Sequence, residues 1–177
     1  MNLNFGRMKN RLLKLFLCLF GMVYGLNAQN SVNVDGRLQP ILNEFLEQCN
    51  LYHIDYHSKL FQLQGIDIVN NLPLEEHNTV LGMVSRDNSG NIDNIYISWA
   101  ALLDNEILKV VAFHEFAHHF LDYKHTCNDC NEIMAETNTS YFNIARNWDE
   151  QVQQLFMTSP VYMSLQKDGS ISPTHSF

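Results

Sequence analysis

The sequence predicts a single domain of the α+β class. Its 177 residues are the length of one domain. With 46% apolar and 17% charged residues, the composition is that of a globular protein and excludes a disordered polyelectrolyte or a fibrous coiled coil. The predicted elements follow one another as helix, strands, helix, loop and helix. That order is typical of an α+β fold and not of an alternating, parallel-sheet protein.

Residues 1–28 are predicted to form a secretory signal peptide. A basic start precedes a short, almost wholly apolar run at residues 12–26, and Asn27-Ala28-Gln29 then supplies a small residue for cleavage after Ala28. The run is shorter than the roughly 20 apolar residues that a membrane-spanning helix needs. We therefore expect export to the periplasm or the cell exterior, with no stable membrane insertion after cleavage. The alternatives are a retained membrane anchor and a buried N-terminal helix.

The charge balance restricts the partners. The chain has 19 acidic and 11 basic residues, a formal charge of −8. Residues 29–177 keep every acidic residue but only seven basic ones, so their formal charge is −12. Nucleic-acid binding needs a cationic surface, and this class of function is therefore excluded. We expect a soluble, monomeric domain in which the excess of acidic residues serves solubility; electrostatic attraction of basic substrates is the alternative.

The first half of the domain is predicted to contain a helix and three strands. Apolar residues recur at helical spacing from Leu38 to Cys49, which predicts an opening amphipathic helix. Residues 61–69 alternate between apolar and polar, and residues 79–84 and 92–98 are rich in strand-forming types. Turn-forming residues at 86–91 join the last two strands in a predicted hairpin.

The strongest predicted helix runs from Asp104 to Leu121. Asp104 can cap its first turn, and apolar residues lie nearly all round it, as is typical of a buried helix. An irregular polar stretch follows, and then a last helix at residues 148–156. The tail from Ser159 is rich in Ser, Pro and Gly, a composition typical of a loose chain end.

The buried helix contains His114-Glu115-Phe116-Ala117-His118, a match to the H-E-x-x-H motif. Residues four apart lie one turn above each other, so both imidazoles can reach one metal ion. A zinc ion bound by neutral imidazoles lowers the pKa of its water towards 7, and Glu115 is placed to act as the general base. The alternative is a pair of surface or core histidines that hydrogen bonds satisfy without a metal.

A zinc enzyme needs a third protein ligand and an open fourth position. Asp122 shares a helix face with His118 but would hinder substrate access, whereas His119 points away from that face. The candidate ligands are His119, Asp122, His125, Glu132 and Glu136.

The stretch from His114 to Met134, HEFAHHFLDYKHTCNDCNEIM, resembles the metzincin clan of zinc endopeptidases, and within it small exported bacterial proteins. The clan pattern is H-E-x-x-H-x-x-G-x-x-H, followed by a turn that contains a methionine. The resemblance implies that His114, His118 and His125 bind zinc, that Glu115 is the base and that Met134 is the Met-turn residue.

The same resemblance implies a zincin fold, in which a small twisted mixed sheet packs on the opening helix and the buried active-site helix. The strand at residues 95–98 would be the substrate-binding edge strand. Two features depart from the clan pattern. Leu121 stands where the clan has glycine, and His125 comes one residue late. Without that glycine the helix has to end in another way.

A gluzincin arrangement is the alternative for the third ligand. There a second helix supplies a glutamate, and residues 131–136 resemble the start of such a helix with Glu132 and Glu136 as candidates. Only 14 residues separate Glu132 from His118, which is short for a turn and a return.

Three cysteines remain after the predicted cleavage site. Cys127 and Cys130 form a lone C-x-x-C in a polar loop, without the second pair of a zinc ribbon or the βαβ context of a thioredoxin site. Export allows a disulfide, either between these two or from one of them to Cys49.

We therefore predict an exported zinc metalloendopeptidase that acts on protein or peptide substrates. Zn²⁺ would be bound by His114, His118 and His125, with Glu115 as catalytic base. Three alternatives remain: a gluzincin-type zinc peptidase that uses Glu132 or Glu136, a non-catalytic zinc-binding or interaction protein, and a structural zinc closed by four protein ligands.

Overall fold

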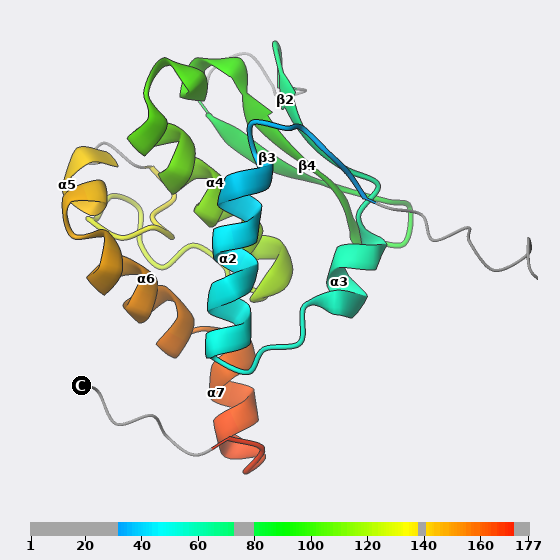
Figure 1. Ribbon diagram of the computed structural model, residues 1–177, viewed down its shortest axis with the longest axis vertical. Coiled ribbons are helices and arrows are strands. Elements are labelled where there is room, and N and C mark those ends of the chain that lie inside the picture. Colours follow the sequence, from blue (N-terminus) through cyan, green and yellow to red (C-terminus); the bar gives the residue numbers. More distant parts are fainter. Residues whose placement is uncertain (1–31, 73–79, 138–140, 172–177) are drawn as a thin grey trace, which may run out of the picture. The chain divides into compact units, whose positions relative to one another are not determined.

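The computed structural model describes residues 32–72, 80–137 and 141–171 (Figure 1). The predicted signal peptide, residues 1–28, lies outside these ranges. Among the described residues, no helix has the length and apolar character needed to cross a membrane. The described chain is an α+β domain with a small mixed sheet, which confirms the predicted α+β class. The zincin fold within that class stays a prediction.

Four strands form the sheet in the order β1-β2-β4-β3. β1 (Asn33–Val34), β2 (Gly65–Val69) and β4 (Ile92–Ser98) are parallel, and β3 (Gly82–Arg86) pairs antiparallel with β4. The predicted hairpin is confirmed. The prediction that residues 95–98 form an edge strand is wrong, because β4 has β2 on one side and β3 on the other. Among the described strands, β3 is the edge on this side of the sheet.

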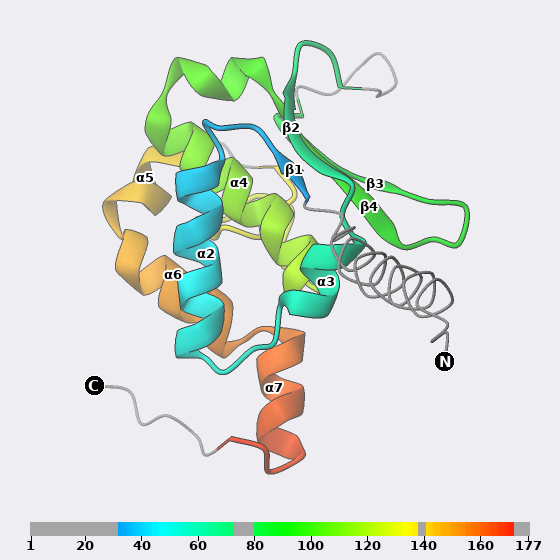
Figure 2. The same ribbon diagram turned by 45° about the vertical axis from the view of Figure 1, so that its right-hand side comes forward.

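The core lies where α2 (Gln39–Leu51) meets α4 (Asn105–Phe120), which also packs on β3 and β4 (Figure 2). Phe45 of α2 is fully buried and sits at the centre of an aromatic cluster. Its ring centroid lies 5.1 to 5.7 Å from those of Phe113, Phe116, Phe120 and Phe156. Both the opening amphipathic helix and the buried helix are therefore confirmed.

Capping residues determine both ends of α4. The Asp104 carboxylate accepts hydrogen bonds from the backbone N–H groups of Glu106 (2.8 Å) and Ile107 (3.3 Å), as the sequence predicts. At the other end, Asp122 adopts the left-handed conformation with φ 56°. The backbone N–H of Tyr123 then bonds the carbonyl of Ala117 at 3.2 Å. The helix thus ends without a glycine, one residue later than in the clan pattern.

The prediction of one strand at residues 61–69 is wrong in its first part. Residues 57–62 form the short helix α3 (His57–Gln62), and only residues 65–69 form strand β2. Only Phe61 and Gln62 of the predicted strand belong to α3, and two residues are too few to distinguish a helical from a strand period.

The C-terminal part of the described chain is helical. A 3₁₀ helix, η1 (Trp99–Leu103), precedes α4, and α5 (Tyr141–Arg146), α6 (Trp148–Met157) and α7 (Pro160–Lys167) follow it. α6 confirms the helix predicted at residues 148–156, but it is not the last one, because α7 follows it. The expectation of a loose tail is wrong for α7, because the Ser159 hydroxyl accepts a hydrogen bond from the N–H of Tyr162 (3.1 Å) and Pro160 occupies the first turn.

The loop after α4 is cross-linked and doubles back on itself. A disulfide joins Cys127 to Cys130, and Cys49 is a buried free thiol. The N–H of Thr126 bonds the carbonyl of Met134 (3.0 Å), and the N–H of Glu136 bonds the carbonyl of Cys127 (2.9 Å). Residues 131–136 therefore form turns and a bridge, not the start of a helix.

Candidate metal centre

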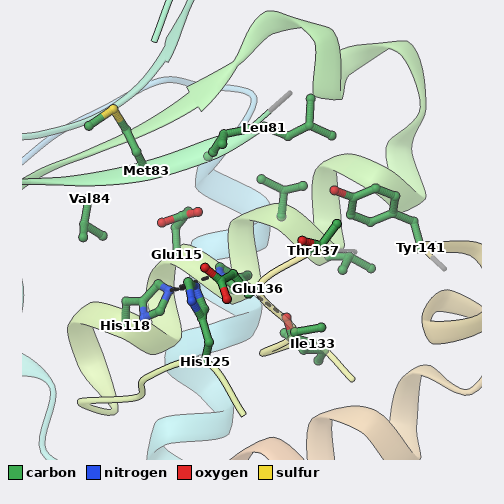
Figure 3. A pocket seen from close by; sticks show the side chains of 16 residues that line it. Leu81, Met83, Val84, Glu115, His118, His125, Ile133, Glu136, Thr137 and Tyr141 are labelled. Atoms are coloured by element: carbon green, nitrogen blue, oxygen red, sulfur yellow. Dashed lines mark hydrogen bonds between the residues drawn. The ribbon is translucent and has the colours of Figure 1, made fainter. Parts of the chain in front are cut away.

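Three histidine side chains converge beside α4 (Figure 3). His114 and His118 lie one turn apart on that helix, and His125 comes from the loop after it. The Nε2 atom of His118 is 3.0 Å from Nε2 of His114 and 3.2 Å from Nε2 of His125. A tetrahedral zinc site with Zn–N bonds of about 2.0–2.1 Å requires nitrogens about 3.3–3.4 Å apart. The observed spacing is within a few tenths of an ångström of that requirement.

Backbone carbonyls determine which nitrogen faces the centre of the cluster. The Nδ1–H of His114 donates to the carbonyl of Ile133 (2.7 Å), and the Nδ1–H of His118 donates to the carbonyl of Tyr123 (2.8 Å). In the neutral rings, both Nε2 atoms then carry lone pairs. Two lone pairs directed at each other over 3.0 Å repel unless a cation lies between them. The donor set therefore fits a metal ion, and the two carbonyls orient its ligands.

Burial keeps the histidines of α4 in the neutral form that metal binding requires. Desolvation, followed by the nearby His118, lowers the pKa of His114 from 6.5 to about 4, although its bond to Ile133 opposes this. Desolvation also lowers the pKa of His118, against the effect of its bond to Tyr123. Both rings are therefore neutral at pH 7, before any metal arrives.

Glu115 projects into the same space between α4 and the edge strand. Figure 3 shows its carboxylate between β3 and the imidazoles of His118 and His125. The residue is 5% exposed, and burial raises the pKa of its carboxyl group to about 8. Gly82 of β3 makes room for it, because a Cβ at position 82 would lie 2.5 Å from Oε1 of Glu115.

These groups line a pocket of about 620 Å³. One wall is the beginning of β3 with Leu81, another is α4 with Val110 and Val111, and the third is the segment from Ile133 to Thr137. Tyr141 of α5 closes one end. The pocket is thus lined about equally by apolar groups, mainly from β3 and α4, and by polar groups, among them the three histidines and Glu115.

Two of the other candidate ligands are held by α3. The Asp122 carboxylate forms an ion pair with Lys59 (2.6 Å), and the Nε2–H of His119 donates to the Lys59 carbonyl (2.8 Å). His119 is 4% exposed, and burial lowers its pKa. Neither residue belongs to the cluster of three histidines, whose ligand atoms all lie within 4.8 Å of one another.

The glutamates of the gluzincin alternative also lie outside the cluster. Glu132 accepts hydrogen bonds from the Thr126 hydroxyl (2.9 Å) and the Gln154 amide (3.3 Å). Glu136 lines the pocket but is not among the close ligand atoms. Met134 is buried, and its assignment as a Met-turn residue stays a prediction.

Sequence reasoning missed three parts of the site. The carbonyls of Ile133 and Tyr123 orient the ligands, and a backbone carbonyl has no signature in a sequence. Gly82 was also missed, although an isolated glycine in a predicted strand often marks a close approach to the backbone. That signal could have identified it.

We compared the chain with protein-family models, with curated proteins and with solved structures, and none of them matches it. The interpretation of the site therefore depends on its own geometry.

Proposed function

We propose that the protein is an exported zinc-dependent endopeptidase with a metzincin-like catalytic domain. One observation carries the proposal. The Nε2 atoms of three histidines converge at near-tetrahedral spacing, and two of the rings are held in the metal-binding tautomer by backbone carbonyls. A buried carboxylate, Glu115, projects into the same pocket.

The chemistry is divided between the bound ion and Glu115. A zinc ion held by the three Nε2 atoms would supply a water of lowered pKa and would polarise the substrate carbonyl. The Glu115 carboxylate accepts a proton as that water attacks the peptide carbon. The protonated carboxyl group then donates the proton to the leaving amine nitrogen. Burial raises the pKa of Glu115 to about 8 in the metal-free protein, and the positive charge of a zinc ion beside it would favour the carboxylate form that a general base needs.

Strand β3 offers a place for an extended peptide. It borders the pocket, and among the described strands only β4 pairs with it. A substrate that adds to this edge would make backbone hydrogen bonds and present alternate side chains to the pocket. The apolar walls at Leu81, Val110 and Val111 favour an apolar substrate side chain next to the scissile bond. We therefore propose β3, and not β4, as the strand beside which a substrate peptide would bind.

A peptidase assay with two variants tests the proposal. We expect the zinc-loaded protein to cut unstructured peptides, a chelator to abolish cleavage and added zinc to restore it. Glu115→Gln should retain zinc and lose at least about 100-fold in kcat. Glu47→Gln makes the same change at an exposed position of α2 and should leave kcat unchanged.

Measurements of zinc affinity separate the alternatives for the third ligand, and the peptidase assay separates a peptidase from a non-catalytic zinc protein. His125→Ala should lower zinc affinity more than Glu132→Gln or Glu136→Gln, whereas a gluzincin site would give the opposite order. A protein that binds zinc but cuts no peptide in a diverse library would contradict the peptidase proposal and favour a non-catalytic zinc protein.

A further inference from the structure

Lys59 of α3 contacts the C-terminal end of α4, the helix that carries His114 and His118. Its Nζ donates to the His119 carbonyl (3.0 Å) and pairs with the Asp122 carboxylate (2.6 Å). Its own carbonyl accepts from the Nε2–H of His119 (2.8 Å). Three contacts thus join one residue to two positions that are about 60 residues further along the chain. The Lys59 side chain is only 22% exposed, unlike that of Asp122 at 63%.

The segment that Lys59 contacts at the end of α4 leads directly to the metal ligands. Asp122 has φ 56°, a left-handed conformation that a residue with a side chain adopts only at a cost. The next residue, Tyr123, presents the carbonyl that orients His118 (2.8 Å). Three residues beyond Asp122, the chain supplies His125. The conformation of Asp122 therefore controls both the orientation of one ligand and the path to another.

Lys59 stabilises this conformation in two ways. The last carbonyls of a helix have no intrahelical partner, and the Lys59 ammonium satisfies that of His119 while its charge favours the negative end of the helix. The same ammonium pairs with the side chain that glycine, the usual residue at such a position, would lack. The contacts of Lys59 thus stabilise, at Asp122, the left-handed conformation that glycine usually adopts after the last turn of a helix.

We infer that Lys59 is a positioning residue for the metal centre, which it preorganises through Asp122 and Tyr123. The inference depends on metal binding by the three histidines, which is part of the proposed function, but not on peptidase activity. Substituting Lys59 should lower metal affinity without removing a ligand, because it disturbs the Tyr123 carbonyl that orients His118, and groups that orient metal ligands typically contribute a factor of about 10 to 100 to affinity.

Zinc affinity, measured by competition with a chromophoric chelator, is the primary test. We expect Lys59→Met to weaken zinc binding by about 10- to 100-fold and Lys59→Arg to retain most of the affinity. Lys167→Met, at an exposed position of α7, is the matched control and should bind zinc like the wild type. The absorption spectrum of the Co²⁺-loaded protein provides a second measurement, since a displaced His118 or His125 alters the ligand field.

A double-mutant cycle tests the proposed route through Asp122. Glycine adopts the left-handed conformation without strain, so Lys59→Met should cost less affinity in an Asp122→Gly background than in the wild type. If Lys59→Met does not fold, as judged by circular dichroism, Asp122→Asn removes the ion pair alone. That variant should then weaken zinc binding in the same direction.

The outcomes are distinct. Unchanged zinc affinity and Co²⁺ spectrum in folded Lys59→Met, or in Asp122→Asn if that variant replaces it, would overturn the positioning role. An equal loss in both backgrounds would overturn the route through Asp122. A wild-type protein that binds no zinc would overturn the metal centre itself, and with it the proposed function.

Discussion

The Glu115 carboxylate occupies the space that a side chain at Gly82 would need. A Cβ at position 82 would lie 2.5 Å from Oε1, 2.7 Å from Cγ and 2.9 Å from Cδ of Glu115, and real Cβ atoms do not approach that closely. Because Gly82 belongs to the edge strand β3, the proposed base is held directly against the proposed substrate-binding strand.

Gly82→Ala should therefore separate metal binding from catalysis. The added methyl group has to displace the Glu115 side chain, and a displacement of about 1 Å in a catalytic group can reduce the rate by about 100-fold. The three atoms nearest to such a Cβ all belong to Glu115 and none to a histidine, so we expect zinc affinity to be unchanged. Measurement of kcat and of zinc affinity for the same preparation checks both expectations.

Gly36→Ala is the matched control, since a Cβ at position 36 has no neighbour within 4 Å. It should retain wild-type kcat and zinc affinity. Full activity in Gly82→Ala would contradict the proposed position of the base.

Glu115→Gln should stabilise the metal-free protein at high pH. The carboxyl pKa is about 8 in the folded chain, against an ordinary value of 4.5, because burial disfavours the charged form. The contribution of this carboxyl group to the free energy of unfolding is fully present below pH 4.5. It is lost as the pH rises through about 8. Glutamine carries no charge, so the variant should escape this loss, with a melting temperature higher by about 10 °C at pH 9 in chelator.

The direction of this pH dependence of stability distinguishes Glu115 from the neighbouring His114. The lowered pKa of His114, about 4, acts in the opposite direction, because its contribution is lost as the pH falls from 6.5 to 4. That term is common to both proteins and cancels in their difference. A difference in melting temperature that does not shrink between pH 9 and pH 4.5 would contradict the assigned burial of Glu115.

Cys49 should be unreactive in the folded protein. It is fully buried, and desolvation raises the pKa of its thiol to about 12. Since the thiolate is the reactive form, iodoacetamide at pH 8 should label Cys49 only after unfolding in denaturant. Cys127 and Cys130 should be labelled only after reduction of their disulfide, and peptide mass spectrometry distinguishes the three sites. Labelling of Cys49 under native conditions would contradict the packing of α2.

Ser159→Ala should weaken the fold through α7. The Ser159 side chain is buried, and its hydroxyl caps the helix by accepting from the N–H of Tyr162 (3.1 Å). Loss of such a cap costs about 1 kcal/mol, which a shift of the urea midpoint would report. Ser164→Ala, at an exposed position within α7, should be neutral or slightly stabilising. Equal midpoints for the two variants would show that the cap contributes nothing.

Local signals in the sequence predicted the elements that depend on local physics. The α4 helix follows from its apolar residues and from Asp104, which caps it as expected. The signal for α7 was also present, because serine followed by proline is a typical helix start, but the Ser, Pro and Gly content of the tail obscured it.

Tertiary pairing, by contrast, could not be derived from the sequence. The residues of β4 show that they form a strand, but not that β2 pairs on one side and β3 on the other. The order of strands depends on which apolar faces meet in three dimensions. The edge was therefore assigned to the wrong member of the hairpin, and the proposed substrate strand moved from β4 to β3.

The candidate site also has a part that the sequence predicts and a part that it does not. Helical spacing places His114, Glu115 and His118 together, and the structure brings His125 to them as the resemblance implied. The contacts that orient these side chains involve residues remote in sequence, such as the Ile133 carbonyl and Lys59. They follow from the packing of loops and helices, which no motif encodes.

X-ray absorption at the zinc edge of the zinc-loaded protein tests the central claim most directly. We expect one zinc ion with three imidazole nitrogens at about 2.0–2.1 Å and at least one oxygen from solvent. The His125→Ala variant should show one imidazole fewer. A shell of four protein ligands, or one with fewer than three imidazoles in the wild type, would contradict an open three-histidine centre.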